Sequence, residues 1–133
     1  MTVLTSAVAI LAMGLSTPSM AYSEQVETIA LATASFQTCE QLGFSVDRKG
    51  ISDWIESAQE SAIAAGLDET EVQSSLKSRI DFEWQRALDR HARDKLMQHS
   101  PENVWRNNRY WQSRCEKLAD DPASSRYFSQ PET

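Results

Sequence analysis

Residues 68–99 have the sequence DETEVQSSLKSRIDFEWQRALDRHARDKLMQH, which predicts the longest helix of the chain. Asp68 and Glu71 have the spacing of a capping box, in which each side chain accepts a hydrogen bond from the other residue's backbone amide. Side chains that recur every three or four residues predict one buried stripe along this helix. The stripe consists of Val72, Leu76, Ile80, Trp84, Leu88 and His91. At 1.5 Å per residue the helix is roughly 45 Å long, so we expect the other elements to pack along it.

Two shorter helices are predicted before this segment. Residues 24–42 carry apolar side chains at helical spacing, and Gly43 followed by Phe44 is typical of a helix C-terminus. Residues 46–50 are expected to form a polar turn. Residues 53–65 then form the second helix, which begins at another capping box and ends at Gly66.

A fourth helix is predicted to begin at Ser100 and Pro101, which suit the N-cap and the first helical position. Its packing seam consists of Val104, Asn108, Trp111, Cys115 and Leu118. The short connection predicts that this helix runs back antiparallel to the long one. Residues 123–128 are expected to add one helical turn, and residues 129–133 a disordered tail.

The sequence therefore predicts an all-α fold. No segment alternates apolar and polar residues as a strand would. We expect a small four-helix bundle with one long central helix, a short C-terminal helical turn and one disulfide, and we expect residues 22–128 to form a single domain.

Residues 1–21 predict a signal peptide. Residues 3–15 form an apolar run of the length found in secretory signals, and Ser19-Met20-Ala21 is a small-residue cleavage site. We expect cleavage after Ala21, a periplasmic location, and no membrane span after cleavage. No Lys or Arg precedes the apolar run, which departs from the usual pattern of a signal peptide. An uncleaved N-terminal anchor is the alternative. Residues 17–19 make a poor end for a membrane span, which favours cleavage.

The chain has two cysteines, Cys39 and Cys115. Export makes a disulfide between them the expected state. Closing a loop of roughly 77 residues stabilises a fold by about 4 to 5 kcal/mol in the chain-entropy model. A redox-active pair is the alternative, but the sequence lacks the C-x-x-C motif of such sites.

The net charge of −6 is unevenly distributed along the chain. Residues 22–75 carry ten acidic and two basic side chains, whereas residues 76–117 carry six acidic and ten basic ones. We favour an arrangement in which the acidic helices pack beside the basic ones, or in which each simply shows a solvated face. A dedicated polyelectrolyte site is the alternative. Overall acidity and export both argue against binding to nucleic acid.

His91 is the first candidate for chemistry, because it lies on the apolar stripe near Asp94. As a general base it would need a nucleophile or a bound water, and no sequence motif supplies one. We therefore expect His91 to be buried and hydrogen-bonded. His99 is too far along the helix to share a metal ion with it. Without an H-E-x-x-H or C-x-x-C-H motif, we expect neither a metal nor a cofactor.

The second candidate is the segment of residues 105–114, in which arginines alternate with aromatic side chains. Such residues can hold anionic or sugar ligands through forked hydrogen bonds and stacking. The interpretation that we favour is that the arginines simply extend over aromatic surface. The candidate binding residues are Trp105, Arg106, Arg109, Tyr110, Arg114 and His91.

A third candidate is the acidic face formed by Asp53, Glu56 and Glu60 on the second helix. Two carboxylates at a suitable separation can hydrolyse glycosides. Three acids at helical spacing are more typical of a solvated face, and this is the interpretation that we favour.

The chain resembles small exported proteobacterial proteins that fold as single-disulfide helix bundles, among them the acid-activated periplasmic chaperones of the HdeA type. The resemblance rests on the signal, the helical pattern, the cysteine pair and the local sequence Thr38-Cys39-Glu40. The interval between the cysteines is longer here, and the tryptophan-rich fourth helix has no counterpart in that family. The ending from Cys115 to Pro122 is similar to that of uncharacterised alphaproteobacterial envelope proteins.

These features favour a non-enzymatic binding or chaperone-like protein of the periplasm. The resemblance implies activation at acid pH, where the carboxylates of the acidic half would be protonated. The alternatives are a small-ligand binder or enzyme that uses His91 or the face of residues 105–114, and a subunit of a larger envelope complex with a protein partner.

Overall fold

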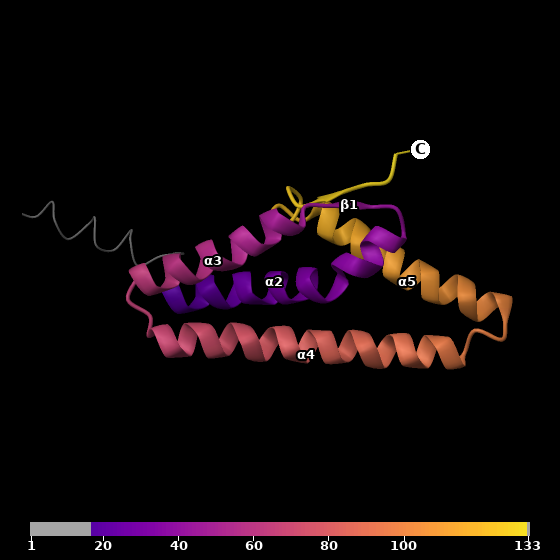
Figure 1. Ribbon diagram of the computed structural model, residues 1–133, viewed down its shortest axis with the longest axis horizontal. Helices are drawn as coiled ribbons and strands as arrows, with labels where there is room; N and C mark the ends of the chain where they lie inside the picture. The colour runs from indigo at the N-terminus through magenta and orange to yellow at the C-terminus, as the bar shows by residue number, and fades with distance from the viewer. Residues whose placement is uncertain (1–16, 133) are drawn as a thin grey trace, which may run out of the picture.

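The computed structural model describes residues 17–132 and is all-α apart from one short strand pair (Figure 1). The elements in chain order are α2 (Pro18–Gln41), β1 (Ser45–Val46), α3 (Arg48–Ala64), α4 (Glu69–Leu96), α5 (Pro101–Asp120) and β2 (Phe128–Ser129). The predicted small helical bundle with a long helix and a Cys39–Cys115 disulfide is confirmed.

Helix α2 lies at the centre and packs against α3, α4 and α5 (Figure 1). The residue pairs that join α2 to α4 keep a nearly constant offset in sequence, which shows that the two helices run parallel. Tyr22 donates a hydrogen bond to the Val72 carbonyl at 2.7 Å, and the Thr38 hydroxyl lies 3.1 Å from a ring nitrogen of His91. Helix α5 turns back from the end of α4 and diverges from it, with the C-terminal end of α2 between them (Figure 1).

Two helices begin earlier than predicted, because their capping residues escaped notice. Helix α2 begins at Pro18 rather than Glu24, since the Thr17 hydroxyl accepts a hydrogen bond from the Met20 amide at 3.2 Å and proline suits the first turn. Helix α3 begins at Arg48 rather than Asp53. The Asp47 carboxylate caps it by accepting a hydrogen bond from the Gly50 amide at 2.8 Å. The predicted polar turn at residues 46–50 is therefore wrong.

Helix α4 is capped by Asp68 as predicted, but its buried stripe is only half right. Val72 and Leu76 are buried, whereas Trp84 and Leu88 are 37% and 48% exposed. Each step of four residues turns about 40° beyond a full helical turn, so a strict four-residue repeat drifts about 160° between Val72 and Leu88. Glu83 lies only about 20° from Val72 around the axis, and it is 1% exposed.

The core has two main parts, both built on α2. One joins the N-terminal halves of α2 and α4 with the C-terminal half of α3, and it contains Tyr22, Val26, Ile29, Ala58, Ala62, Val72 and Leu76. The other surrounds the disulfide and contains Ala32, Cys39, Phe44, Ile51, Cys115, Leu118 and Phe128. The disulfide therefore lies inside the core rather than on its edge.

The C-terminal segment is tied to this second part of the core. Residues 122–127 form a series of turns, and β2 then pairs antiparallel with β1, placing Val46 opposite Phe128. Phe128 is 1% exposed. Ser129, which the sequence predicts to lie in a disordered tail, is paired with Ser45. The alternation that identifies a strand cannot be recognised in only two residues.

The predicted signal peptide lies mostly outside the described residues, since only residues 17–21 of it are included. Residues 18–21 form the first turn of α2, and the predicted cleavage site after Ala21 therefore falls inside a helix. Within residues 17–132, no helix is both long and apolar enough to cross a membrane.

Tyr22 gives a testable contribution to stability. Burial raises the pKa of its hydroxyl above the ordinary value, against the opposing effect of a hydrogen bond with Ser75. Because of the raised pKa, the Tyr22 hydroxyl of the folded protein keeps its proton at a pH where the unfolded chain has lost it. The contribution of Tyr22 to the free energy of unfolding therefore declines as the pH rises through about 10. Tyr22→Phe should lower the free energy of unfolding by about 1 kcal/mol at neutral pH and remove this alkaline dependence, as measured by urea denaturation. Tyr110→Phe, at a ring that is 39% exposed, is the control and should change neither quantity.

Candidate functional site

The candidate residues from the sequence gather on the hairpin formed by α4 and α5. Ser100 caps α5, since its hydroxyl accepts a hydrogen bond from the Asn103 amide at 3.5 Å, and Pro101 occupies the first turn. Helices α4 and α5 diverge from this connection, and different side chains line the two sides of the hairpin. His91 and Trp111 lie on one side, and an arginine cluster lies on the other.

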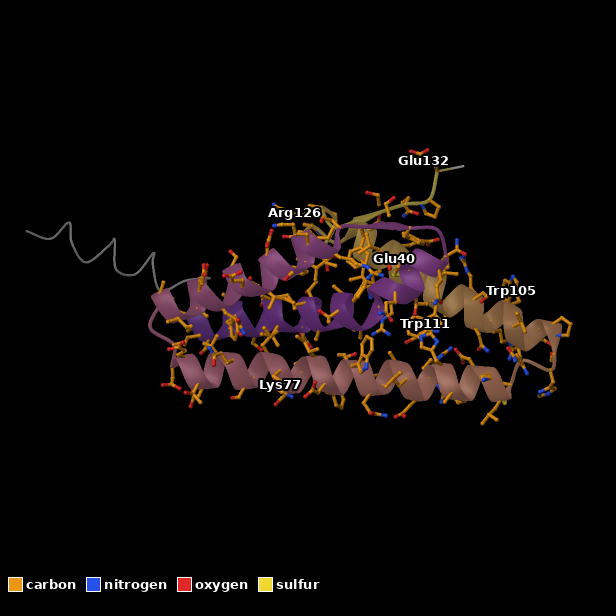
Figure 2. The ribbon with its side chains drawn as sticks, viewed as in Figure 1. Glu40, Lys77, Trp105, Trp111, Arg126 and Glu132 are labelled. Atoms are coloured by element: carbon orange, nitrogen blue, oxygen red, sulfur yellow. A yellow bond between two sulfur atoms is a disulfide. The ribbon has the colours of Figure 1, made fainter. Side chains whose placement is uncertain are left out.

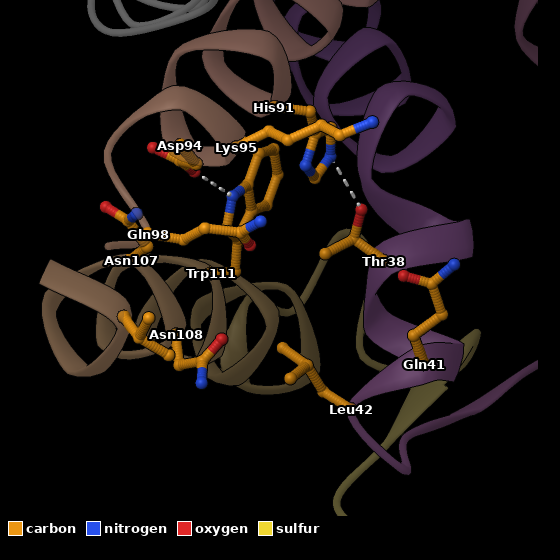
Figure 3. Close-up of a pocket in the computed structure, with 11 residues that line it drawn as sticks. Thr38, Gln41, Leu42, His91, Asp94, Lys95, Gln98, Asn107, Asn108 and Trp111 are labelled. Carbon is orange, nitrogen blue, oxygen red and sulfur yellow. Dashed lines mark hydrogen bonds between the residues drawn. The ribbon is translucent and has the colours of Figure 1, made fainter. Parts of the chain in front are cut away.

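On the first side, the His91 ring stacks on Trp111 with 4.5 Å between the ring centroids and an interplanar angle of 4°. Trp111 donates a hydrogen bond from Nε1 to Asp94 Oδ2 at 3.3 Å (Figure 3). Together with Thr38 and Leu42 of the α2 end, these side chains line a cavity of about 270 Å³. Trp111 is 4% exposed and belongs to the seam that the sequence predicts.

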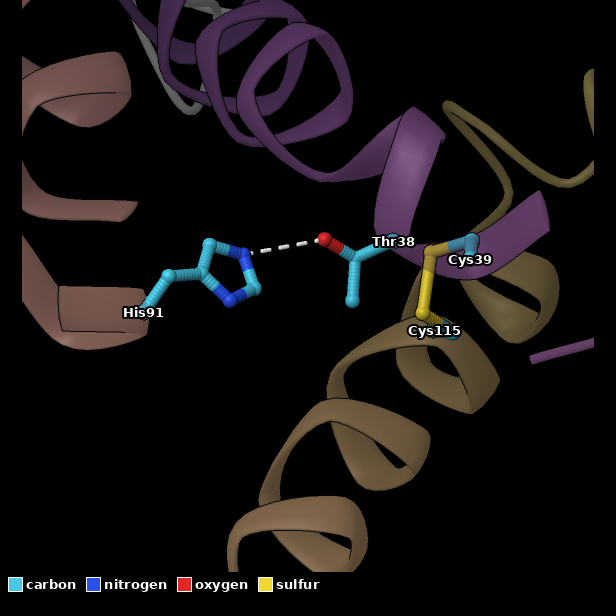
Figure 4. The surroundings of a disulfide bond; sticks show 4 residues. All are labelled: Thr38, Cys39, His91 and Cys115. Carbon is cyan, nitrogen blue, oxygen red and sulfur yellow. Dashed lines mark hydrogen bonds between the residues drawn. A yellow bond between two sulfur atoms is a disulfide. The ribbon is translucent and has the colours of Figure 1, made fainter. Parts of the chain in front are cut away.

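His91 itself is exposed, so the prediction of a buried histidine is wrong. The drift of the four-residue repeat accounts for this, because His91 lies about 100° from Val72 around the helix axis. The prediction of a hydrogen bond holds, since His91 Nε2 is 3.1 Å from the Thr38 hydroxyl (Figure 4).

The His91 cavity provides little for nucleophilic catalysis. Asp94 is engaged by Trp111 and lies 3.3 Å from the Arg90 Nε, so it is directed away from the His91 ring. Thr38 lies in the last turns of α2, where the backbone amides are used by helical hydrogen bonds and cannot stabilise an oxyanion. The arrangement suits a polar binding groove better than a catalytic triad.

On the second side, the carboxylate of Glu83 is the centre of an arginine cluster. It is 1% exposed and lies 3.4 Å from Arg79 Nη2, 3.4 Å from Arg86 Nη1 and 3.5 Å from Arg114 Nη2. Arg114 comes from α5, so this single buried charge connects the two helices of the hairpin. One carboxylate balances one of the three guanidinium groups, and Arg79 is also 3.4 Å from Glu27 on α2.

Aromatic contacts extend the cluster along α5. The Arg90 guanidinium lies 3.6 Å from the centroid of the Tyr110 ring, and that of Arg114 lies 5.4 Å from the Trp111 ring. Tyr110 meets Trp111 edge to face at 5.3 Å. These contacts place Arg114 and Tyr110 within the arginine cluster, while Arg106 is paired with Glu102 at 2.9 Å and Trp105 is 66% exposed.

The disulfide fastens this hairpin to the centre of the molecule. Cys39, near the end of α2, is bonded to Cys115 on α5, and both residues are fully buried (Figure 4). A redox-active cysteine needs partial exposure, so the environment of this pair supports a structural role.

The acidic face of α3 has the character of a solvated surface. Asp53, Glu56 and Glu60 are exposed, and Asp53 pairs with Lys49 at 2.8 Å in the preceding turn. Among residues 17–132, no group of three His, Cys, Asp or Glu side chains is arranged to hold a metal ion.

The sequence analysis does not identify Glu83, its partners Arg79 and Arg86, or the neighbouring Arg90, which pairs with Asp94. A detectable signal exists, because acidic and basic residues at positions 79, 83, 86, 90 and 94 follow one another at intervals of three or four. Opposite charges at that spacing face each other on a helix. The burial of Glu83, however, depends on α2 and α5 and is not a local property.

Comparison with protein-family models, with curated proteins and with solved structures finds no match for this chain.

Proposed function

We propose that this protein is a non-enzymatic, exported binding protein of the bacterial periplasm with a chaperone-like or adaptor role. The observation that carries the proposal is a group of exposed apolar side chains where α4 meets α5. This group, which we name the hairpin tip, comprises Leu96, Met97, Val104 and Trp105, with exposed fractions of 81%, 47%, 38% and 66%.

Single exposed apolar residues are common on protein surfaces and need no explanation. The hairpin tip differs because its four members fall within residues 96–105, at the end of the molecule farthest from α3 (Figures 1 and 2). Methionine adapts its shape to varied partners, and tryptophan is among the residues that contribute most to binding energy at interfaces. The tip is therefore well suited to contact another protein.

Export is supported by the apolar run at residues 3–15 and by the buried disulfide, because disulfides persist in oxidising compartments. The non-enzymatic part of the proposal is supported by the His91 cavity, in which the neighbouring carboxylate is engaged by Trp111 and Arg90.

A photo-reactive amino acid placed at Trp105 in cells tests this proposal. We expect covalent adducts with other envelope proteins after illumination, identified by mass spectrometry. One stoichiometric adduct would support an adaptor or complex subunit, whereas many unrelated adducts that increase under acid or heat would support a chaperone. The same amino acid at Glu60, which is exposed on α3, is the matched control. Adduct yields at Trp105 no higher than at Glu60 would contradict the proposal.

A further inference from the structure

Two cavities on the arginine side of the hairpin adjoin each other and together form what we name the basic cleft. Their volumes are about 310 Å³ and 810 Å³. Tyr110 and Arg114 line both cavities, so the two spaces meet at these side chains. The smaller cavity lies against α4, and the larger one lies between α5 and the Glu27–Leu31 turn of α2. The cleft is therefore elongated across three helices.

The cleft is strongly basic for a chain whose net charge is −6. Seven basic side chains line it, against three acidic ones. Among the residues that the structure describes, Arg93, Arg109 and Lys117 have no carboxylate within ion-pair distance. The remaining charges are partly balanced, since Arg86 and Arg114 share the single carboxylate of Glu83. Within residues 17–132, the cleft thus holds three cationic groups that form no ion pair with a carboxylate.

The cleft also offers apolar contacts between its charges. The Tyr110 ring is 39% exposed at the junction of the two cavities, and Leu31 and Leu118 line the larger one. A small inorganic anion would fill little of this space and would leave the apolar surface unused. A peptide that alternates carboxylates with apolar side chains matches both features, because guanidinium groups bind carboxylates through forked hydrogen bonds.

The walls of the cleft are held in place before any ligand arrives. Glu83 pairs with Arg86 at 3.4 Å and with Arg114 at 3.5 Å, and Arg90 lies between Asp94 and the Tyr110 ring. Side chains that are ordered in advance lose less conformational entropy when a ligand binds. Arg93 and Arg109 are both exposed and remain available to the ligand.

We infer that the basic cleft binds an acidic peptide segment of a partner protein. The carboxylates of the segment contact Arg93, Arg109 and Lys117, and an apolar side chain covers the Tyr110 ring. This inference rests on the proposed binding function and assigns the chemistry of the partner: an acidic segment next to a surface that the hairpin tip contacts.

Fluorescence anisotropy with the purified full chain tests the inference. The probe is a labelled peptide of repeated Glu-Glu-Leu triplets, and the same peptide with lysine in place of glutamate is the charge-reversed control. We expect the acidic peptide to bind, with an affinity that falls as salt is added, and the basic peptide not to bind. The double substitution Arg93→Gln with Arg109→Gln should weaken binding about tenfold, since it removes two charge-assisted contacts.

The double substitution Arg126→Gln with Lys49→Gln is the matched control, because it also removes two positive charges, from exposed residues that do not line the cleft; Arg126 lies on the turn before β2 (Figure 2). It should leave the affinity within about twofold of the wild-type value. Absence of binding by the acidic peptide, or equal effects of the two sets of substitutions, would overturn the inference. Displacement of the peptide by inorganic phosphate at a similar concentration would also overturn it, because the cleft would then recognise any oxyanion.

The two proposals fail separately. Peptide binding at the cleft without protein adducts at Trp105 would retain the acidic-ligand site and contradict the proposed function. Adducts at Trp105 without peptide binding would retain the proposed function and remove the acidic segment from it.

Discussion

Replacing both Cys39 and Cys115 with alanine should lower the free energy of unfolding by about 4 to 5 kcal/mol. The bridge joins residues that are 76 positions apart, so its loss releases a long loop in the unfolded chain and raises the entropy of that state. A domain of this size has a total stability of about 5 to 15 kcal/mol, so the variant would lose a large share of it. Urea denaturation followed by circular dichroism measures the change.

The wild-type protein treated with a reductant is the control for this variant. Both cysteines are fully buried, so the alanine substitutions remove packed sulfur atoms as well as the bond. Reduction removes the bond alone, and it should account for most of the loss. A double variant that is less stable than oxidised wild type by under about 1 kcal/mol would contradict the proposed structural role of the bridge.

Glu83→Gln should be the most destabilising substitution of a charged residue in α4, at about 2 to 3 kcal/mol. The glutamine keeps the shape of the side chain but leaves Arg79, Arg86 and Arg114 without the carboxylate that they share. Removing one member of a fully buried ion pair costs about 3 to 5 kcal/mol, and these arginines are partly hydrated, which reduces the effect. Thermal and chemical denaturation give the measurement.

Asp81→Asn is the matched control on the same helix. Asp81 pairs with Lys77 at 2.7 Å, but both side chains are well exposed, so its loss should cost under about 0.5 kcal/mol. Similar costs for the two substitutions would show that Glu83 does not organise the arginine cluster. Since Glu83 joins α4 to α5, its loss should also weaken peptide binding at the basic cleft.

The sequence predicts the C-terminal ends of α2 and α3 and the N-terminal ends of α4 and α5 from local signals, although the local caps at Thr17 and Asp47 were missed. Gly43 and Gly66 both adopt positive φ angles, of 95° and 102°, immediately after the helices that the sequence predicts to end there. Asp68 and Ser100 accept the capping hydrogen bonds that their positions imply. These features depend on a few neighbouring residues, and a linear pattern therefore contains them.

Features that depend on partners far along the chain were predicted poorly. Trp84 and Leu88 are apolar and helically spaced, yet the face of α4 that α2 covers follows the true helical repeat and leads to Glu83 and Ala87 instead. Hydropathy alone does not predict a buried glutamate. The burial of Glu83 is tolerable because three arginines from two helices lie beside its carboxylate. The candidate binding residues of the sequence lie on one helical hairpin, but the two-sided arrangement of His91 and Arg114 follows from the divergence of α4 and α5.

The Cys39–Cys115 bond also determines how the hairpin tip would respond to mechanical load. The bond closes a covalent ring in which two chain segments connect the tip to Cys39. One is α5 itself, from Pro101 to Cys115; the other passes through α4, α3 and β1 and is much longer. When a partner pulls on the tip, the shorter segment becomes taut first and transfers the tension through the sulfur bridge to the end of α2. The bond therefore adds a short covalent path for tension between the tip and α2, beside the packed contacts between α4 and α2.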